Sequence, residues 1–222
     1  DHHGATHCRL NSVGLAANLF SGNQRPLKYY HPVMEDAAVA LFSSGTTGEP
    51  KAIVNSIEHL LQNAQMHVQS VSLSACDVVG ITLPLYYSYG LVANLLGSLL
   101  VKARISIHAQ TGTLDHQWLR REKISFIGLT PFFSDSLRQP LPELKAVTLG
   151  GDVLHNERAL QLMANFPGCR FYATYGLTEA GPRVATWPFE QRVLQHNPIA
   201  PLGKPLAGVN LILKSAQAIA CR

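Results

Sequence analysis

The chain has 222 residues, of which 46% are hydrophobic and 14% are charged. This composition excludes an intrinsically disordered protein, which needs low hydrophobicity and high net charge, and the length is enough to bury a substantial core. The formal net charge of +4 does not favour nucleic-acid binding, because the longest basic run, Arg120-Arg121, is followed directly by Glu122. An average soluble protein is about 25% charged, so the low value suggests that part of the surface is normally covered.

The sequence predicts neither a membrane span nor a disulfide scaffold. A spanning helix needs about 18 uninterrupted apolar residues, and the longest apolar stretch, residues 91–101, is interrupted by Asn94, Gly97 and Ser98. The cysteines are far apart and form no CxxC pair, which is typical of reduced thiols in a cytoplasmic protein. They are Cys8, Cys76, Cys169 and Cys221.

In chain order, residues 1–35 are poorly periodic and rich in Gly, Asn, His and Pro, so they predict an irregular N-terminal segment. Beyond them, short apolar runs alternate with segments of helical spacing. The apolar runs predict strands over 37–42, 78–83, 104–108, 126–129, 146–149, 170–174 and 209–213. The helical segments predict three apolar faces: Ile57, Leu60, Leu61, Ala64 and Val68; Leu91, Leu95, Leu96 and Leu99; and Leu154, Leu160, Leu162 and Met163.

This alternation predicts an α/β fold. Strand–helix–strand units build a mainly parallel sheet that is flanked by helices on both faces. No repeat, linker or low-complexity tract divides residues 36–222, so we expect one α/β unit there.

A loop rich in glycine and hydroxyl groups follows the first predicted strand and reads SSGTTGEPK from Ser43 to Lys51. Its glycines let backbone N–H groups turn toward an anion, its hydroxyls add donors and Lys51 adds a positive charge, which suits a nucleotide triphosphate. It is not a Walker A loop, because only two residues separate Gly45 from Gly48 and Pro50 precedes Lys51. Taken alone, a Gly/Ser/Thr loop is more often a flexible surface turn.

The whole string closely resembles the phosphate loop of the adenylate-forming superfamily, which includes acyl-CoA synthetases, aryl and fatty-acyl ligases, luciferases and peptide-synthetase adenylation domains. The pattern of that superfamily is SGTTG-x-PK, usually followed by Gly where this chain has Ala52. The resemblance implies that Lys51 is catalytic and that the loop binds the phosphates of ATP. The residues implied are Ser43, Ser44, Gly45, Thr46, Thr47, Gly48 and Lys51.

Residues 83–90, LPLYYSYG, resemble the superfamily segment LP-x-x-H-x-x-G, with Tyr87 in place of the usual histidine. The resemblance implies an acyl pocket formed by Tyr86, Tyr87, Tyr89 and Gly90; without it, an aromatic core cluster is the more common interpretation. Amino-acid-activating relatives carry an aspartate early in this segment, where it pairs with the substrate ammonium. This segment has no acid, so we expect an uncharged acyl or aryl carboxylic acid rather than an α-amino acid.

Two further segments match in the same order. Gly150-Gly151-Asp152 is similar to the GG-x-x-L turn beside the adenine, although a Gly-Gly pair alone is simply a turn. Residues 172–179, YATYGLTE, resemble the YG-x-TE signature, in which a ring stacks on adenine, a hydroxyl reaches the α-phosphate and a carboxylate binds Mg²⁺. The Thr-Glu pair is equally compatible with a helix start. The resemblance implies an adenine site at Gly150, Gly151, Tyr175 and Gly176, with Thr178 and Glu179 as catalytic residues and Glu179 as the Mg²⁺ ligand.

Residues 202–208, LGKPLAG, resemble the G-[RK]-P-x-x-G turn that follows in the superfamily, whose role is chiefly structural. Together the segments span about three quarters of the chain. The resemblance implies ATP-dependent activation of a small carboxylic acid as an acyl-adenylate, with release of pyrophosphate and the help of Mg²⁺. CoA or a phosphopantetheine thiol is the implied acceptor, and an acyl carrier protein is a candidate partner.

Superfamily members continue beyond this turn to a TGD segment and a small C-terminal domain that carries a lysine, and neither precedes Arg222. Residues 36–222 therefore predict a partial AMP-binding domain, which we expect to bind ATP weakly and to turn over slowly when alone. Two alternatives stay open: a non-catalytic remnant that binds a nucleotide or acyl group, and an amino-acid adenylation domain.

Overall fold

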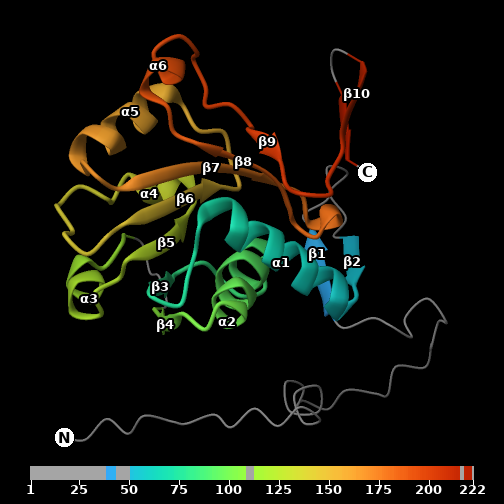
Figure 1. Ribbon diagram of the computed structural model, residues 1–222, viewed down its shortest axis with the longest axis horizontal. Helices are drawn as coiled ribbons and strands as arrows, with labels where there is room; N and C mark the ends of the chain where they lie inside the picture. Colours follow the sequence, from blue (N-terminus) through green and yellow to red (C-terminus); the bar gives the residue numbers. More distant parts are fainter. Residues whose placement is uncertain (1–38, 44–50, 109–112, 216–217, 222) are drawn as a thin grey trace, which may run out of the picture. The chain divides into compact units, whose positions relative to one another are not determined.

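The main feature of the fold is a seven-stranded sheet with strand order β4-β3-β5-β6-β7-β8-β9. The computed structural model describes residues 39–43, 51–108, 113–215 and 218–221 (Figure 1). Strands β4 to β7 pair in parallel and β8 and β9 are added antiparallel, which confirms the predicted α/β fold with a mainly parallel sheet. The strands are β3 (Val78–Ile81), β4 (Arg104–Ile107), β5 (Phe126–Leu129), β6 (Ala146–Gly150), β7 (Arg170–Gly176), β8 (Arg183–Pro188) and β9 (Lys204–Pro205).

The first and last predicted strands lie outside this sheet. β1 (Val39–Ser43) pairs antiparallel with β2 (Lys51–Asn55), and β10 (Leu211–Ser215) pairs antiparallel with β11 (Ala218–Cys221). The strands predicted over 37–42 and 209–213 are thus present, but each forms a hairpin with a neighbour that the sequence analysis did not predict. The residues of the phosphate-loop string between β1 and β2 lie outside the described part of the chain.

Helices cover both faces of the sheet (Figure 1). One face packs against Leu119 of α3, Leu162 of α5 and Leu194 of α6, and the other against Val68 of α1 and Leu95 of η2. No helix in the described ranges is long and apolar enough to cross a membrane. The helices are α1 (Ile57–Val71), η2 (Tyr89–Leu96), α2 (Gly97–Leu100), α3 (His116–Arg121), α4 (Pro131–Ser134), α5 (Asn156–Asn165), η3 (Thr178–Ala180) and α6 (Gln191–Leu194).

Helix α1 follows its predicted face except at Ile57 and Leu61, of which Leu61 is only partly buried. It begins after Ser56, whose side chain accepts a hydrogen bond from the His59 N–H at 3.2 Å, and it ends at Ser72, which adopts a left-handed conformation. Ile57 lies in the first turn and is 50% exposed, so its assignment to the buried face is wrong. The buried residues are Leu60, Asn63, Ala64, His67, Val68 and Val71, which places two polar side chains inside the protein.

The predicted face of the second helix is wrong at its C-terminal end, because this helix is π-helical. The Gly97 N–H donates to the carbonyl of Val92, five residues earlier, and this wider turn rotates later residues away from a 3.6-residue repeat. Val92, Ala93 and Asn94 are buried instead, and Leu99 is 53% exposed. The third predicted face is shorter than expected, because Leu154 is buried but precedes α5.

Asn63 ties α1 to β8, and its removal is expected to destabilise the fold. Its side-chain amide donates to the Arg183 carbonyl and accepts from the Arg183 N–H, both at 2.8 Å and both buried. Asn63→Ala leaves these backbone groups unpaired, so we expect a loss of about 2–4 kcal/mol in the free energy of unfolding, measured with urea. Gln62→Ala is the matched control, because Gln62 is exposed and bonds only the Glu58 side chain among the described residues. Equal losses in the two variants would contradict this assignment.

Candidate functional site

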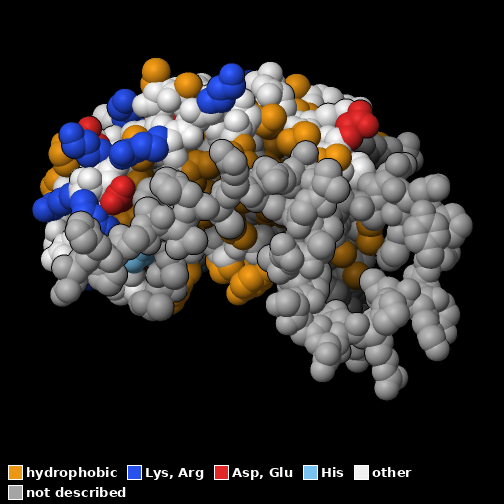
Figure 2. Space-filling view, turned by 90° about the horizontal axis from the view of Figure 1, so that it is seen from below, with side chains coloured by type: hydrophobic (Ala, Val, Ile, Leu, Met, Phe, Trp, Pro, Cys, Tyr) orange, Lys and Arg blue, Asp and Glu red, His pale blue; other side chains and the backbone are white. Residues whose placement is uncertain are grey.

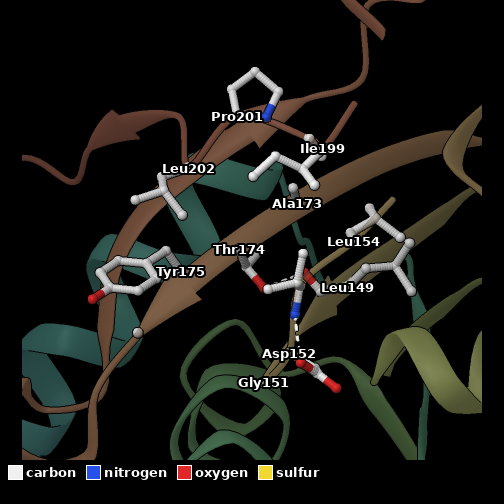
Figure 3. Close-up of a pocket in the computed structure, with 13 residues that line it drawn as sticks. Leu149, Gly151, Asp152, Leu154, Ala173, Thr174, Tyr175, Ile199, Pro201 and Leu202 are labelled. Atoms are coloured by element: carbon white, nitrogen blue, oxygen red, sulfur yellow. Dashed lines mark hydrogen bonds between the residues drawn. The ribbon is translucent and has the colours of Figure 1, made fainter. Parts of the chain in front are cut away.

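A cavity of about 310 Å³ opens at the carboxyl ends of β6 and β7, where ligands bind in open α/β sheets. Small-molecule sites usually measure roughly 300–1,000 Å³, so the cavity has the size of a small-ligand site. In Figure 3, Leu149 and Leu154 lie at one end and Tyr175 and Leu202 at the other. The Thr174 hydroxyl inside it already donates to the Leu149 carbonyl at 2.9 Å. Apart from Asp152, the remaining lining is mainly apolar, which favours an apolar ligand group over an anionic one.

Residues 199–202 form a further wall of this cavity (Figure 3). The Ala200 N–H donates to the Leu154 carbonyl at 2.8 Å, and the Asn156 N–H donates to the Pro198 carbonyl at 3.1 Å. These bonds hold the segment against the chain that leads into α5. This wall was not predicted from the sequence. Its only signal is a short apolar run before the turn at Gly203, and such a run does not show what it packs against.

The predicted adenine residues gather around the cavity, with one exception. Gly151, Tyr175 and Gly176 line it. Gly151 has a φ of +90°, a left-handed conformation that glycine adopts without strain. Gly150 lies behind the cavity, where a Cβ atom would come within 2.5 Å of the Thr174 hydroxyl oxygen and 3.3 Å of the Tyr89 ring. Gly150 therefore separates the cavity from Tyr89 on the α1 side of the sheet.

Thr178 and Glu179 lie in the short turn η3, one residue after the end of β7. The Thr178 hydroxyl is 3.2 Å from the Ser88 hydroxyl, and the two share a hydrogen bond. Glu179 is exposed and forms no hydrogen bond or ion pair with the residues that the structure describes. A carboxylate next to a hydroxyl at the end of β7 is thus available to a ligand. Ser88 was not predicted as a site residue, because a single serine in an aromatic segment carries no distinctive pattern.

The predicted phosphate-binding residues fall largely outside the described ranges. Ser44 to Gly48 lie in the undescribed interval, and Ser43 and Lys51 end β1 and begin β2, where they are paired in the hairpin register. Their role in phosphate binding stays a prediction. Among the described residues, no three His, Cys, Asp or Glu side chains gather into a metal site. A nucleotide-bound Mg²⁺ does not need such a cluster, because one or two carboxylates and the phosphates suffice.

The tyrosines of the predicted acyl pocket do not lie together, because two of them are exposed and one is buried. Tyr86 and Tyr87 are 73% and 60% exposed, with ring centroids 5.4 Å apart. Tyr89 is buried, and its hydroxyl donates to the Thr148 hydroxyl at 2.8 Å. Gly90 is buried against the Pro84 carbonyl, which a Cβ atom would approach within 2.5 Å. Of the four, only Tyr89 therefore places a ring beneath the carboxyl ends of β6 and β7.

The model of the AMP-binding enzyme family matches residues 10–218. The chain belongs to this family. Among its curated relatives in the family, 4-coumarate–CoA ligase 3 of Arabidopsis thaliana is 30% identical over 161 residues, which cover 67% of this chain and 28% of the ligase. Malpinin synthetase of Mortierella alpina is 27% identical over 194 residues, which cover 81% of this chain and 2% of the synthetase. The chain thus spans less than a third of the length of either relative.

Solved structures of CoA synthetases share the fold. O-succinylbenzoate CoA synthetase from Bacillus subtilis, in complex with AMP, superposes with a TM-score of 0.71 at 20% identity, over 84% of this chain and 39% of that one. A variant of E. coli MenE with bound OSB-AMS gives a TM-score of 0.68 at 24% identity, over 82% and 38% of the two chains. These superpositions confirm the fold that the motifs predicted, and the family model confirms the family.

Proposed function

We propose that the complete protein activates a carboxylic acid with ATP, and that this chain carries its nucleotide site and part of its acyl site. One observation carries the proposal: a chain of the AMP-binding family places an apolar cavity of about 310 Å³ directly beside its Thr-Glu turn. An apolar cavity suits a purine base, and the hydroxyl and carboxylate at its edge suit the phosphates and their metal ion. The chain spans only part of its relatives, so the activity is assigned to the complete protein.

The proposed reaction uses the residues in separate roles. Gly151 and Tyr175 hold the adenine, and the Thr178 hydroxyl, positioned by Ser88, hydrogen-bonds the α-phosphate. An oxygen of the substrate carboxylate attacks the α-phosphorus, the bond to the bridging oxygen breaks, and pyrophosphate leaves with its electron pair. Bound Mg²⁺ supplies neutralisation of the phosphate charge. Glu179 fits this ion, because its carboxylate is exposed and has no partner in the described part of the chain.

The acceptor in the proposal is a thiol, of CoA or of a phosphopantetheine arm on a carrier protein. Several relatives are named CoA ligases, including the 4-coumarate–CoA ligases, and another is named D-alanine–D-alanyl carrier protein ligase. The absence of an acidic residue from 83–90 argues against the recognition of a substrate ammonium. An acyl or aryl acid is therefore proposed rather than an amino acid.

Filling the cavity is expected to weaken nucleotide binding. Ala200 is half-buried in the cavity wall, so Ala200→Trp places an indole where the adenine is proposed to lie. In the full-length protein we expect the Kd for ATP to rise by at least about tenfold. Calorimetry measures the binding, and acid-dependent exchange of pyrophosphate into ATP measures the reaction.

The matched control is Ala164→Trp, which adds the same ring to an exposed alanine of α5 that does not line the cavity. We expect it to bind ATP like the wild type. If Ala200→Trp folds normally and also binds ATP unchanged, the nucleotide does not occupy this cavity. If the wild-type protein shows no acid-dependent exchange with any carboxylic acid, the proposed activity is wrong.

A further inference from the structure

Arg183, at the start of β8, is buried without a counter-charge in the described part of the chain. The residue is 2% exposed, and its Nε and Nη2 atoms have no hydrogen-bond partner among the residues that the structure describes. No carboxylate among the described residues forms an ion pair with it. The guanidinium lies over the Tyr89 ring, 4.8 Å from the ring centroid. An aromatic face attracts a cation, but it leaves the N–H donors unsatisfied.

The surroundings of Arg183 are polar and equally unsatisfied. His67 of α1 is fully buried, and neither ring nitrogen has a hydrogen-bond partner within the described ranges. Burial and the positive charge of Arg183 hold the pKa of His67 well below its usual value, so the ring is neutral. Unpaired polar groups of this kind are unfavourable in a pocket that binds only a hydrocarbon chain.

Arg183, Tyr89 and His67 form a polar cluster whose position relates it to the proposed reaction. Ser88 precedes Tyr89 and bonds the Thr178 hydroxyl, so the cluster begins one residue from the site proposed for the α-phosphate. Arg183 is also joined to that site through its own strand, because it pairs with Gly176 of β7. The cluster therefore lies beneath the reacting end of the nucleotide site, on the α1 side of the sheet.

An unpaired buried guanidinium is stabilised by an anion, and the unpaired N–H donors of Arg183 indicate which kind of anion. Burying a charge without a partner is strongly unfavourable, and removing one partner of a buried ion pair leaves this same state. The Nε and Nη2 atoms present adjacent N–H groups along one edge of the guanidinium. A carboxylate accepts both in a bidentate pair, which is the geometry that Arg provides and Lys does not.

We infer that Arg183 binds a second carboxylate of the acyl substrate, so that the acid activated is a dicarboxylic acid. This inference rests on the proposed function and refines it. One carboxylate is held for reaction beside Thr178, and the other pairs with Arg183 beside Tyr89. The uncharged acyl group expected from the sequence is thereby replaced by an anionic one. The lack of an acid in 83–90 agrees with both, since neither substrate carries an ammonium group.

Dicarboxylic and monocarboxylic acids of equal chain length test the inference in the full-length protein. We expect acid-dependent exchange of pyrophosphate into ATP to have a KM at least about tenfold lower for butanedioate or pentanedioate than for butanoate or pentanoate. In Arg183→Gln the KM for the dicarboxylates should rise by at least about tenfold, while that for the monocarboxylates stays the same or falls. Arg183→Lys should restore the preference only in part. Arg192→Gln, which changes an exposed arginine of α6, should leave the preference intact.

The possible outcomes separate the inference from the proposed function. A wild-type preference for monocarboxylates, or an equal loss for both classes in Arg183→Gln, would overturn the role of Arg183 while leaving carboxylate activation in place. Absence of exchange with every acid would overturn the proposed function instead. Thermal unfolding gives a second readout that does not depend on turnover or on the variant. We expect butanedioate to raise the Tm of the wild-type protein more than butanoate does, and equal shifts would contradict the inference.

Discussion

Replacing Gly203 with alanine is expected to destabilise the protein by about 3–5 kcal/mol, a large effect for the addition of one methyl group. Gly203 has a φ of +92°, and a Cβ atom there would lie 2.3 Å from the carbonyl carbon and oxygen of Thr186 and 2.5 Å from the Trp187 nitrogen. These are backbone atoms of β8, so no flexible side chain can move aside. The substitution must displace either β8 or the turn that leads into β9.

Two other glycines separate the effect of the close approach from that of the backbone conformation. Gly208 and Gly168 have φ values of +82° and +88°, but a Cβ atom at either position meets nothing within 4 Å. Alanine there pays only for the left-handed conformation, about 1–2 kcal/mol. Urea unfolding with a shared m-value measures all three variants. A loss in Gly203→Ala no greater than in Gly208→Ala would show that the turn moves freely away from β8.

The same turn connects stability to the candidate site. Residues 199–202 form one wall of the cavity, and Gly203 is the point at which the chain leaves that wall and crosses β8. A partly folded Gly203→Ala protein is therefore expected to lose nucleotide binding before it loses its central strands. The resemblance of residues 202–208 to a structural turn agrees with this role, although the sequence alone does not show which strand the turn contacts.

The central strands were predictable because their sequences are short apolar runs, a pattern typical of buried parallel strands. All four residues of β5 and all five of β6 are buried, so each strand is a short apolar run bounded by polar residues, as expected for a parallel strand covered on both faces. The first five residues of β8 are also buried, but this strand was not predicted. It begins with Arg183, and a buried cation interrupts the apolar pattern on which the prediction depends. The buried Arg183 that interrupts the apolar pattern is the same residue for which we infer a role in acyl binding.

The candidate site was predictable where its residues are close together in sequence. Gly151, Tyr175 and Gly176 were found from short motifs, since each motif follows a strand whose carboxyl end faces the same cavity. The Ser88–Thr178 contact joins positions 90 residues apart, and the Asn63–Arg183 contacts join positions 120 apart. Such pairs depend on the packing of α1 and η2 against the sheet. The π-helical turn in η2 also shifts which of its side chains are buried, and no periodicity in the sequence indicates that shift.

Glu179→Gln is expected to lower acid-dependent exchange of pyrophosphate into ATP by at least about a hundredfold in the full-length protein. Glutamine keeps the size of the side chain but removes the negative charge proposed to bind the Mg²⁺ of the nucleotide. Glu179 is exposed and has no partner among the described residues, so the substitution should leave the free energy of unfolding within about 0.5 kcal/mol of the wild type. The rate is measured at saturating ATP over a series of Mg²⁺ concentrations.

The dependence on Mg²⁺ distinguishes a metal ligand from a residue that only shapes the turn. A lost ligand should shift the half-saturating Mg²⁺ concentration upward, whereas a distorted turn should lower the maximal rate at every concentration. Glu143→Gln is the matched control, because Glu143 is an exposed carboxylate that lines neither the cavity nor η3. Its rate and Mg²⁺ dependence should follow the wild type. If Glu179→Gln exchanges pyrophosphate at the wild-type rate under limiting Mg²⁺, Glu179 is not the metal ligand. The protein ligand of the metal is then another residue.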